Sequence, residues 1–419
     1  MQSIKHISGW AVYDSRGRPT VAAEVILSDG SRGSAFAPSG ASTGQKEAFE
    51  LRDHGEKLGG YTVNQALAAV NDTYAKALIG QSFDSQESFD RNLLVCDGDP
   101  LKKNLGSNSA LALSVAFARA AAQSSKQELY EYLSLGGLTW PLPWLNFING
   151  GVHVSEGLSI QEFMIVPHGM RDLQDVIEAG AGIYMTLKTM LQAKGLSTLV
   201  GDEGGFAPAL SGSLEALDLL MEAVIKTGMQ PGRDVSLALD VAASECFKDS
   251  YYHIDGQRLD KYQWVERLAE WTQDYPIISL EDPADEHDWE CWACLMHEVG
   301  QYVWLIGDDL FATQTEHINE GIMRSAANAV LIKPNQVGTL TEALEATQFA
   351  HENNMLTVMS HRSGDTEDSF IADCALAWGV HGIKSGACAR SERLSKYNRL
   401  LTVAHHNPHI KPAQFPEFD

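Results

Sequence analysis

Six apolar runs in the second half of the chain lead into polar side chains of the types that perform metal-assisted chemistry. The runs supply Asp240, Glu281, Asp308, Lys333, the segment His361-Arg362-Ser363, and Lys384. From Glu281 onward these positions (281, 308, 333, 361 and 384) are separated by about the length of one strand and one helix. Because the C-terminal ends of parallel barrel strands converge on one mouth, the spacing predicts a shared site.

Three of these residues are candidate metal ligands. Asp240, Glu281 and Asp308 would repel one another at one mouth unless a hard cation lay between them. Ligation by oxygen alone favours Mg²⁺, with Mn²⁺ as a close substitute. The alternative is that each acidic residue only caps a helix or forms a turn after its strand. Three of them at successive strand ends favour the metal site.

Lys333 and Glu203 are the candidate base and acid. Lys333 follows the apolar run Ala-Val-Leu-Ile, and burial lowers the pKa of an amine towards the range of a general base. The alternative is a lysine that only reaches the barrel rim. Glu203 lies in the glycine-rich segment 201–205, where a carboxyl with a raised pKa could act as a general acid. A solvated acidic turn is the alternative there. Base, acid and metal ligands together predict metal-assisted proton abstraction.

Other polar residues could bind an anionic substrate. Arg362, Ser363 and Lys384 form a cationic group in an acidic chain, and arginine matches phosphate with a fork of donors. His153 presents an imidazole on the loop 149–153, although a single histidine is more often structural. Ser42 lies in the small-residue loop 38–44, which could be a lid over the site or simply a flexible loop.

Composition limits the classes of partner. The chain has 31 Lys plus Arg and 55 Asp plus Glu, for a net charge of −24, which disfavours nucleic acid and anionic membranes. The first 20 residues lack the apolar region of a signal peptide, and no apolar run reaches the ~18 residues of a membrane span. Six cysteines in 419 residues do not form a disulfide framework. We therefore expect a cytoplasmic protein.

The chain divides into two patterns, because 419 residues exceed a barrel of roughly 250. Residues 1–136 read as a strand meander followed by helices, which predicts an N-terminal α+β capping domain. Residues 137–419 alternate strands with helices, which predicts an α/β domain built as a parallel (β/α)₈ barrel. The tail, with three His and three Pro, is expected to be poorly ordered.

Short motifs along nearly the whole chain are similar to those of the enolase family. In the family's order they are DSRGRPT, APSGASTG with KEAFELRD, NGGVH, IQEFMI, VGDEGGFAP, ALDVAASE, SLEDP, GDDLF, LIKPNQVG, SHRSGDTED, and IKSG with ARSER and KYN. The resemblance implies an enolase-type barrel behind a capping domain. It also implies a phosphopyruvate hydratase, a carbon–oxygen lyase that reversibly dehydrates 2-phosphoglycerate to phosphoenolpyruvate in glycolysis and gluconeogenesis.

The resemblance also implies a role for each residue. Asp240, Glu281 and Asp308 would hold one Mg²⁺, and Ser42 would ligate a second Mg²⁺ that arrives with substrate. Lys333 would remove the C2 proton, and Glu203 would protonate the departing C3 hydroxyl. The implied substrate-binding residues are His153, Gln161, Glu162, His361, Arg362, Ser363 and Lys384. A homodimer or a larger assembly of dimers is implied as well.

Three departures from the family pattern keep alternatives open. Arg18 stands where the family has Asn, Pro334 follows the proposed base, and the loop 152–159 has an unusual composition. Proline fixes φ and removes an N–H, so it could shift Lys333. One alternative is a paralogue that acts on a related phospho- or phosphonate acid. Another is a secondary binding role at a cell surface or in a complex, which the intact set of catalytic residues disfavours.

Overall fold

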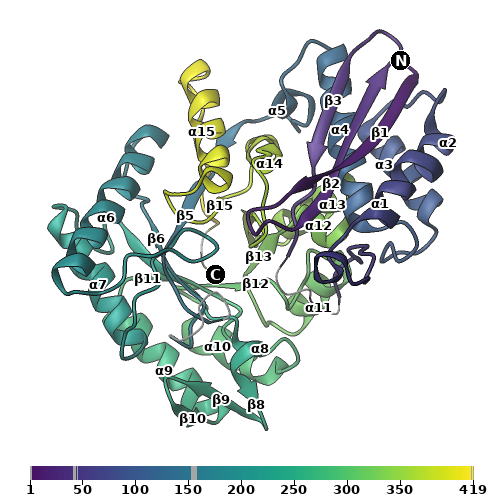
Figure 1. The fold of residues 1–419 in the computed structure, drawn as a ribbon. Coiled ribbons are helices and arrows are strands. Elements are labelled where there is room, and N and C mark those ends of the chain that lie inside the picture. The colour runs from purple at the N-terminus through teal and green to yellow at the C-terminus, as the bar shows by residue number, and fades with distance from the viewer. Residues whose placement is uncertain (1, 41–43, 45, 152–157, 417, 419) are drawn as a thin grey trace.

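The N-terminal part of the chain is a three-stranded antiparallel sheet packed against helices (Figure 1). The computed structural model describes all residues except 1, 41–43, 45, 152–157, 417 and 419. The strands and α-helices of this part are β1 (Ile4–Tyr13), β2 (Pro19–Leu27), β3 (Arg32–Phe36), α1 (Asn64–Ala68), α2 (Ala75–Leu78), α3 (Gln86–Asp97), α4 (Ser107–Ser124) and α5 (Leu129–Tyr132). Gly33 lets β3 approach α4 closely, because a Cβ there would lie 2.2 Å from the Ala116 carbonyl oxygen.

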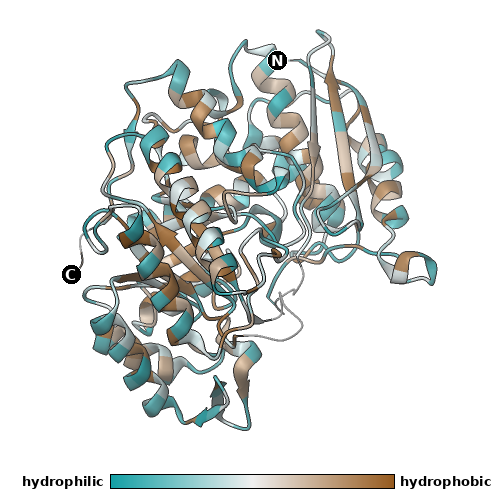
Figure 2. Cartoon of the chain, turned by 60° about the vertical axis from the view of Figure 1, so that its left-hand side comes forward, coloured by the Kyte–Doolittle hydropathy of each residue, from teal (hydrophilic) through white to brown (hydrophobic). Residues whose placement is uncertain are grey.

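Eight further strands form a closed barrel in the order β11-β12-β13-β14-β15-β5-β6-β7. They are β5 (Leu142–Asn149), β6 (Glu162–Val166), β7 (Ser236–Asp240), β11 (Ile277–Glu281), β12 (Trp304–Gly307), β13 (Ala329–Ile332), β14 (Leu356–Ser360) and β15 (Gly382–Lys384). Nearly every residue in these strands is buried, as expected for strands covered on both faces. Figure 2 shows the hydrophobic strands inside a shell of helices with hydrophilic outer faces.

One barrel strand departs from the predicted parallel arrangement. β6 runs antiparallel to both β5 and β7, whereas the other neighbouring pairs are parallel. An apolar strand of this kind pairs equally well in either direction, so its composition does not exclude the antiparallel arrangement. The reversal matters for the site: Glu162, the first residue of β6, lies opposite Asn149 and Asp240, the last residues of its neighbours.

Helices and a small second sheet surround the barrel. The larger helices are α6 (Leu173–Ala193), α7 (Ser213–Lys226), α9 (Lys261–Asp274), α10 (Trp289–Val299), α11 (Thr315–Met323), α13 (Leu340–Glu352), α14 (Phe370–Trp378) and α15 (Ser391–His406). The short elements are β4 (Thr139–Trp140), α8 (Ala243–Cys246), β8 (Phe247–Lys248), β9 (Tyr251–Ile254), β10 (Gln257–Leu259), α12 (Pro334–Val337) and β16 (Lys411–Pro412). Within the described ranges, no helix is both long enough and apolar enough to cross a membrane.

The C-terminal tail packs against the barrel, so the expectation of a poorly ordered end is wrong for its described residues. β16 pairs in parallel with β4. The Phe415 ring lies 5.9 Å from the ring of Trp144, a fully buried residue of β5. The composition of the tail suggested disorder, but a strand pairing and the aromatic contacts of Phe415 and Phe418 anchor it.

Candidate active site

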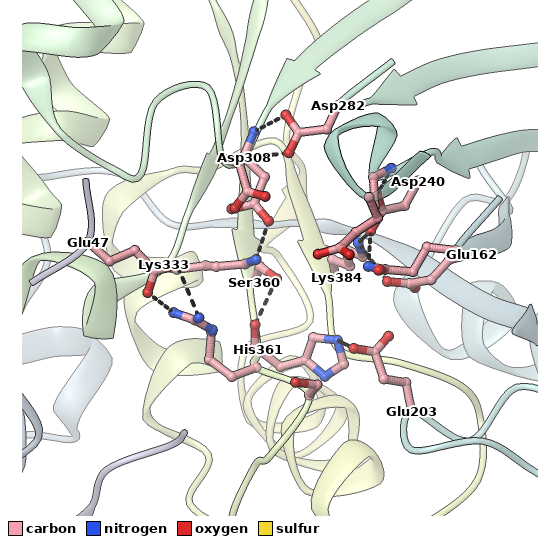
Figure 3. Close-up of a pocket in the computed structure, with 16 residues that line it drawn as sticks. Glu47, Glu162, Glu203, Asp240, Asp282, Asp308, Lys333, Ser360, His361 and Lys384 are labelled. Atoms are coloured by element: carbon pink, nitrogen blue, oxygen red, sulfur yellow. Dashed lines mark hydrogen bonds and ion pairs between the residues drawn. The ribbon is translucent and has the colours of Figure 1, made fainter. Parts of the chain in front are cut away.

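A cavity at the mouth of the barrel brings together most of the predicted residues (Figure 3). It is lined by Glu47, Gln161, Glu162, Glu203, Asp240, Ala242, Glu245, Asp282, Asp308, Asp309, Lys333, Ser360, His361, Arg362, Ser363 and Lys384. Glu281 does not line the cavity but contacts Lys384. Ser42 and His153 lie outside the described residues.

Lys384 lies among buried carboxylates rather than beside Arg362. Its Nζ is 2.9 Å from Glu162 Oε1, 2.7 Å from Asp240 Oδ2 and 2.9 Å from Glu281 Oε1. Burial, followed by repulsion from Glu203, raises the pKa of Glu162 well above its ordinary value. Burial, followed by repulsion from Asp240, does the same to the pKa of Glu281. Burial alone would lower the pKa of Lys384, but its carboxylate neighbours outweigh burial and raise it. The cationic group predicted from sequence is therefore divided, with Lys384 compensating the acidic side of the cavity.

Lys333 forms an ion pair with Asp308. Burial is the largest single influence and lowers the pKa of Lys333, but the carboxylates around it, Asp308 first and then Glu281, together raise the pKa above its ordinary value. The expected lowering by burial is therefore reversed by the neighbouring carboxylates acting together. Asp308 is itself held by Gln336, whose Nε2 donates to Asp308 Oδ1 at 3.0 Å.

Pro334 begins α12 without distorting the end of β13. Proline at the first helical position loses no hydrogen bond, because that N–H has no partner within the helix. Lys333, the residue before it, has φ −120° and ψ 100°, the extended conformation that a following proline favours. Its N–H still donates to Thr313 Oγ1 at 2.9 Å.

A second set of carboxylates lies beside the first. Among the described residues, Asp282, Asp308 and Asp309 have oxygens within 4.8 Å of one another. Asp282 Oδ1 and Oδ2 accept the backbone N–H groups of Asp308 and Asp309 at 2.9 and 2.8 Å. Burial and then Asp308 raise the pKa of Asp309 to about 7. Of the three ligands predicted from sequence, only Asp308 belongs to this set. The oxygen-rich, mutually repelling side chains fit a hard divalent cation.

Glu203 is contacted from two sides by polar side chains. Its Oε1 lies 3.6 Å from His361 Nε2, and its Oε2 accepts a hydrogen bond from Asn146 Nδ2 at 3.3 Å. No sequence pattern singles out Asn146, because it lies in the interior of β5, where a functional amide looks the same as a core residue. Gln161, by contrast, was predicted, and its Nε2 donates to Asp240 Oδ2 at 3.2 Å.

Arg362 meets a residue of the N-terminal part of the chain. Its Nη1 lies 2.8 Å from Glu47 Oε2 and donates to Asn335 Oδ1 at 3.0 Å. Both members of the ion pair are almost fully buried. Glu47 lies in KEAFELRD, one of the motifs similar to those of the enolase family. The position of this residue in the sequence did not by itself indicate a chemical role. Through Glu47, the N-terminal part of the chain therefore contributes a side chain to the mouth of the barrel.

Fold and site together define a barrel enzyme whose mouth holds buried carboxylates, two lysines and an arginine, with one further carboxylate, Glu47, contributed by the N-terminal α+β part. Residues 4–133 match the family described as enolase, N-terminal domain, and residues 137–408 match the family described as enolase, C-terminal TIM barrel domain. The chain belongs to the enolase family and is a lyase of the enolase superfamily.

Proposed function

We propose that the protein catalyses the reversible dehydration of 2-phosphoglycerate to phosphoenolpyruvate. The observation that supports this most is that Lys333 and Glu203 enter one pocket from different sides (Figure 3). The reaction removes a proton from C2 and hydroxide from C3, so it needs a base and an acid in separate positions.

Lys333 takes the C2 proton in this scheme, and it must be neutral to do so. A cation held by Asp308 would weaken the ion pair that otherwise raises the pKa of Lys333. That proton is weakly acidic, because its removal places a second negative charge next to the substrate carboxylate. A bound Mg²⁺ would supply compensating positive charge there, and Asp240, Glu281 and Asp308 are the proposed ligands. Lys384, held among carboxylates, would place a further positive charge beside the substrate.

Glu203 and the phosphate-binding residues complete the scheme. Glu203 donates its proton to the C3 hydroxyl, which leaves as water. Arg362 and Ser363 bind the phosphate, since a guanidinium offers it two parallel hydrogen bonds. Gln161, Glu162, His361 and His153 are proposed to line the rest of the substrate site. Ser42 is proposed as ligand of a second Mg²⁺, and a cytoplasmic homodimer or assembly of dimers as the working form.

A related phospho- or phosphonate acid is the alternative substrate. Two of the sequence departures that suggested this substrate, Arg18 and Pro334, do not line the cavity. The guanidinium of Arg18 lies 3.9 Å over the Tyr61 ring. Pro334 occupies a favourable helix position. A panel of phospho- and phosphonate acids separates the two substrates, and the proposal requires 2-phosphoglycerate to be the best of them.

The direct test follows the two half-reactions in heavy water. Lys333→Ala should lose both exchange of the C2 hydrogen and formation of phosphoenolpyruvate. Glu203→Gln should keep the exchange and lose the product. A general acid or base contributes roughly 10²–10⁴-fold, so both losses are measurable by proton NMR of C2 and by product absorbance, with and without Mg²⁺.

The opposite pattern would reverse the two roles. Exchange and dehydration that survive in both variants would show that neither residue is catalytic. Full turnover by the unaltered protein in excess chelator would contradict the proposed metal dependence.

A further inference from the structure

Arg393, at the start of α15, joins three parts of the active site. Its guanidinium is fully buried. Nη1 lies 2.5 Å from His361 Nδ1 and donates to the Arg362 carbonyl at 2.7 Å. Nη2 donates to the carbonyls of Ser363 and Asp202 at 2.7 and 3.0 Å. One side chain therefore fixes the loop that carries Arg362 and the loop that carries Glu203.

The contact with His361 determines where the imidazole carries its proton. A guanidinium has donors and no acceptor, so the ring nitrogen that faces Arg393 must accept. Nδ1 then holds the lone pair, and the proton of the neutral ring is on Nε2. Burial lowers the pKa of His361 to about 4, which keeps the ring neutral near neutral pH.

The Nε2–H group faces the acid. His361 Nε2 lies 3.6 Å from Glu203 Oε1, while Asn146 donates to the other oxygen. This separation is longer than a hydrogen bond, so the donation requires the two side chains to approach each other. A donor in that position favours the charged form of Glu203 over the neutral form.

We propose that Arg393 is a positioning residue, which holds His361 in the Nε2–H tautomer so that the ring donates to Glu203 once Glu203 has given up its proton. This rests on the proposed function, in which Glu203 is the acid. In the step itself the O–H bond of Glu203 breaks, and its electron pair stays on the carboxylate. The proton joins the C3 hydroxyl, the C3–O bond breaks so that water leaves, and the electron pair at C2 forms the C2=C3 double bond. The N–H bond of His361 remains intact throughout.

Arg393→Met tests the proposal, and Arg390→Met is its matched control. Arg390 also contacts the loop of Glu203, through the Gly201 carbonyl at 3.1 Å, and it pairs with Glu392. No described contact joins it to His361. The ratio of dehydration to C2 exchange should fall at least tenfold in Arg393→Met and stay unchanged in Arg390→Met. A merely structural role would lower both half-reactions together.

A second pair of variants leaves Arg393 in place. Glutamine can put an amide N–H near the position of Nε2, whereas asparagine puts its amide near Nδ1. His361→Gln should keep dehydration within about tenfold of the unaltered protein, and His361→Asn should lose about 10²-fold or more. Equal losses in the two variants would overturn the proposal.

¹⁵N NMR of the unaltered protein gives a readout independent of activity. It should show His361 with a protonated Nε2 and an unprotonated Nδ1. A proton on Nδ1 would overturn the inference even if Glu203 is the acid. Undiminished dehydration in Glu203→Gln would instead overturn the proposed function, whatever the tautomer.

Discussion

Single residues at the site carry charges that depend on one another. Arg362 and Glu47 are both buried and paired, and they come from different parts of the chain. Removal of one partner leaves an uncompensated buried charge, which costs about 3–5 kcal/mol. Arg362 therefore has two separable effects, one on stability through Glu47 and one on the proposed phosphate contact.

Arg362→Ala should lower both stability and catalytic efficiency. Hydrogen bonds to charged groups contribute about 1.5–3 kcal/mol each, so kcat/KM for 2-phosphoglycerate should fall at least tenfold. The double variant with Glu47→Ala should recover much of the lost stability in urea unfolding but none of the activity. If activity returned together with stability, the phosphate would have to bind elsewhere.

Among the elements, the loop after β15 sets the position of the acid. Ala387 N–H donates to the Glu203 carbonyl at 2.9 Å, and Gly386, with φ +73°, allows this approach. A Cβ at Gly386 would lie 2.5 Å from that carbonyl oxygen. At Gly379, with a similar φ of +66°, the nearest atom to a Cβ would be Thr139 Oγ1 at 3.8 Å.

The two glycines form a matched pair of substitutions. Gly379→Ala should lose only about 1–2 kcal/mol of stability, the cost of a left-handed conformation. Gly386→Ala should lose about 1–3 kcal/mol more, because its methyl group overpacks against the loop of Glu203, and its rate of dehydration should fall. Denaturant midpoints and product absorbance measure the two effects. Equal behaviour of the two variants would show that the close approach is unimportant.

Strand ends were predictable from the sequence, and strand direction was not. Apolar runs that stop at Asp240, Glu281 and Lys333 place these residues at one mouth whatever the details of packing. An apolar run reads the same in either direction, however, so nothing in β6 itself signalled that it is reversed. The similarity to the enolase family indicated that Glu162 belongs to the site, while the reversal of β6 explains how the first residue of a strand reaches it.

Across the whole molecule, the two parts of the chain meet through buried polar groups. Asp90 on α3 accepts hydrogen bonds from the N–H and hydroxyl of Thr341 on α13, at 3.0 and 2.7 Å. Such long-range pairs follow from the way the parts pack, so local sequence patterns could not predict them. The same holds for Glu47 at the site and for the pairing of Lys333 with Asp308.

Asp90 should make the stability depend on pH. Burial raises its pKa to about 6, so between about pH 4 and 6 the folded protein holds a proton that the unfolded chain releases. The contribution of Asp90 is therefore fully present below about pH 4 and is lost as the pH rises through 6. A shift of about two pKa units corresponds to about 3 kcal/mol.

Asp90→Asn should remove this dependence. Relative to the unaltered protein, the variant should gain up to about 3 kcal/mol of unfolding free energy as the pH rises from about 4 to 7. Glu87→Gln, at an exposed position on the same helix, is the control and should show no such gain. Urea unfolding at several pH values gives the difference. Parallel curves for Asp90→Asn and the unaltered protein would contradict the assignment.

The seam that closes the barrel has a consequence for the order of events during folding. β15 pairs with β5, so Gly382 is the partner of Leu142, although the two residues lie near opposite ends of the sequence that forms the barrel. Contacts between segments so distant in sequence form slowly, because chain entropy is lost before the contacts can stabilise the fold. Helices and the β1–β2–β3 meander involve neighbouring segments and need no such closure. Lys384 reaches its carboxylate partners only when the seam is complete, so a refolding chain should recover its helical circular dichroism before it recovers turnover.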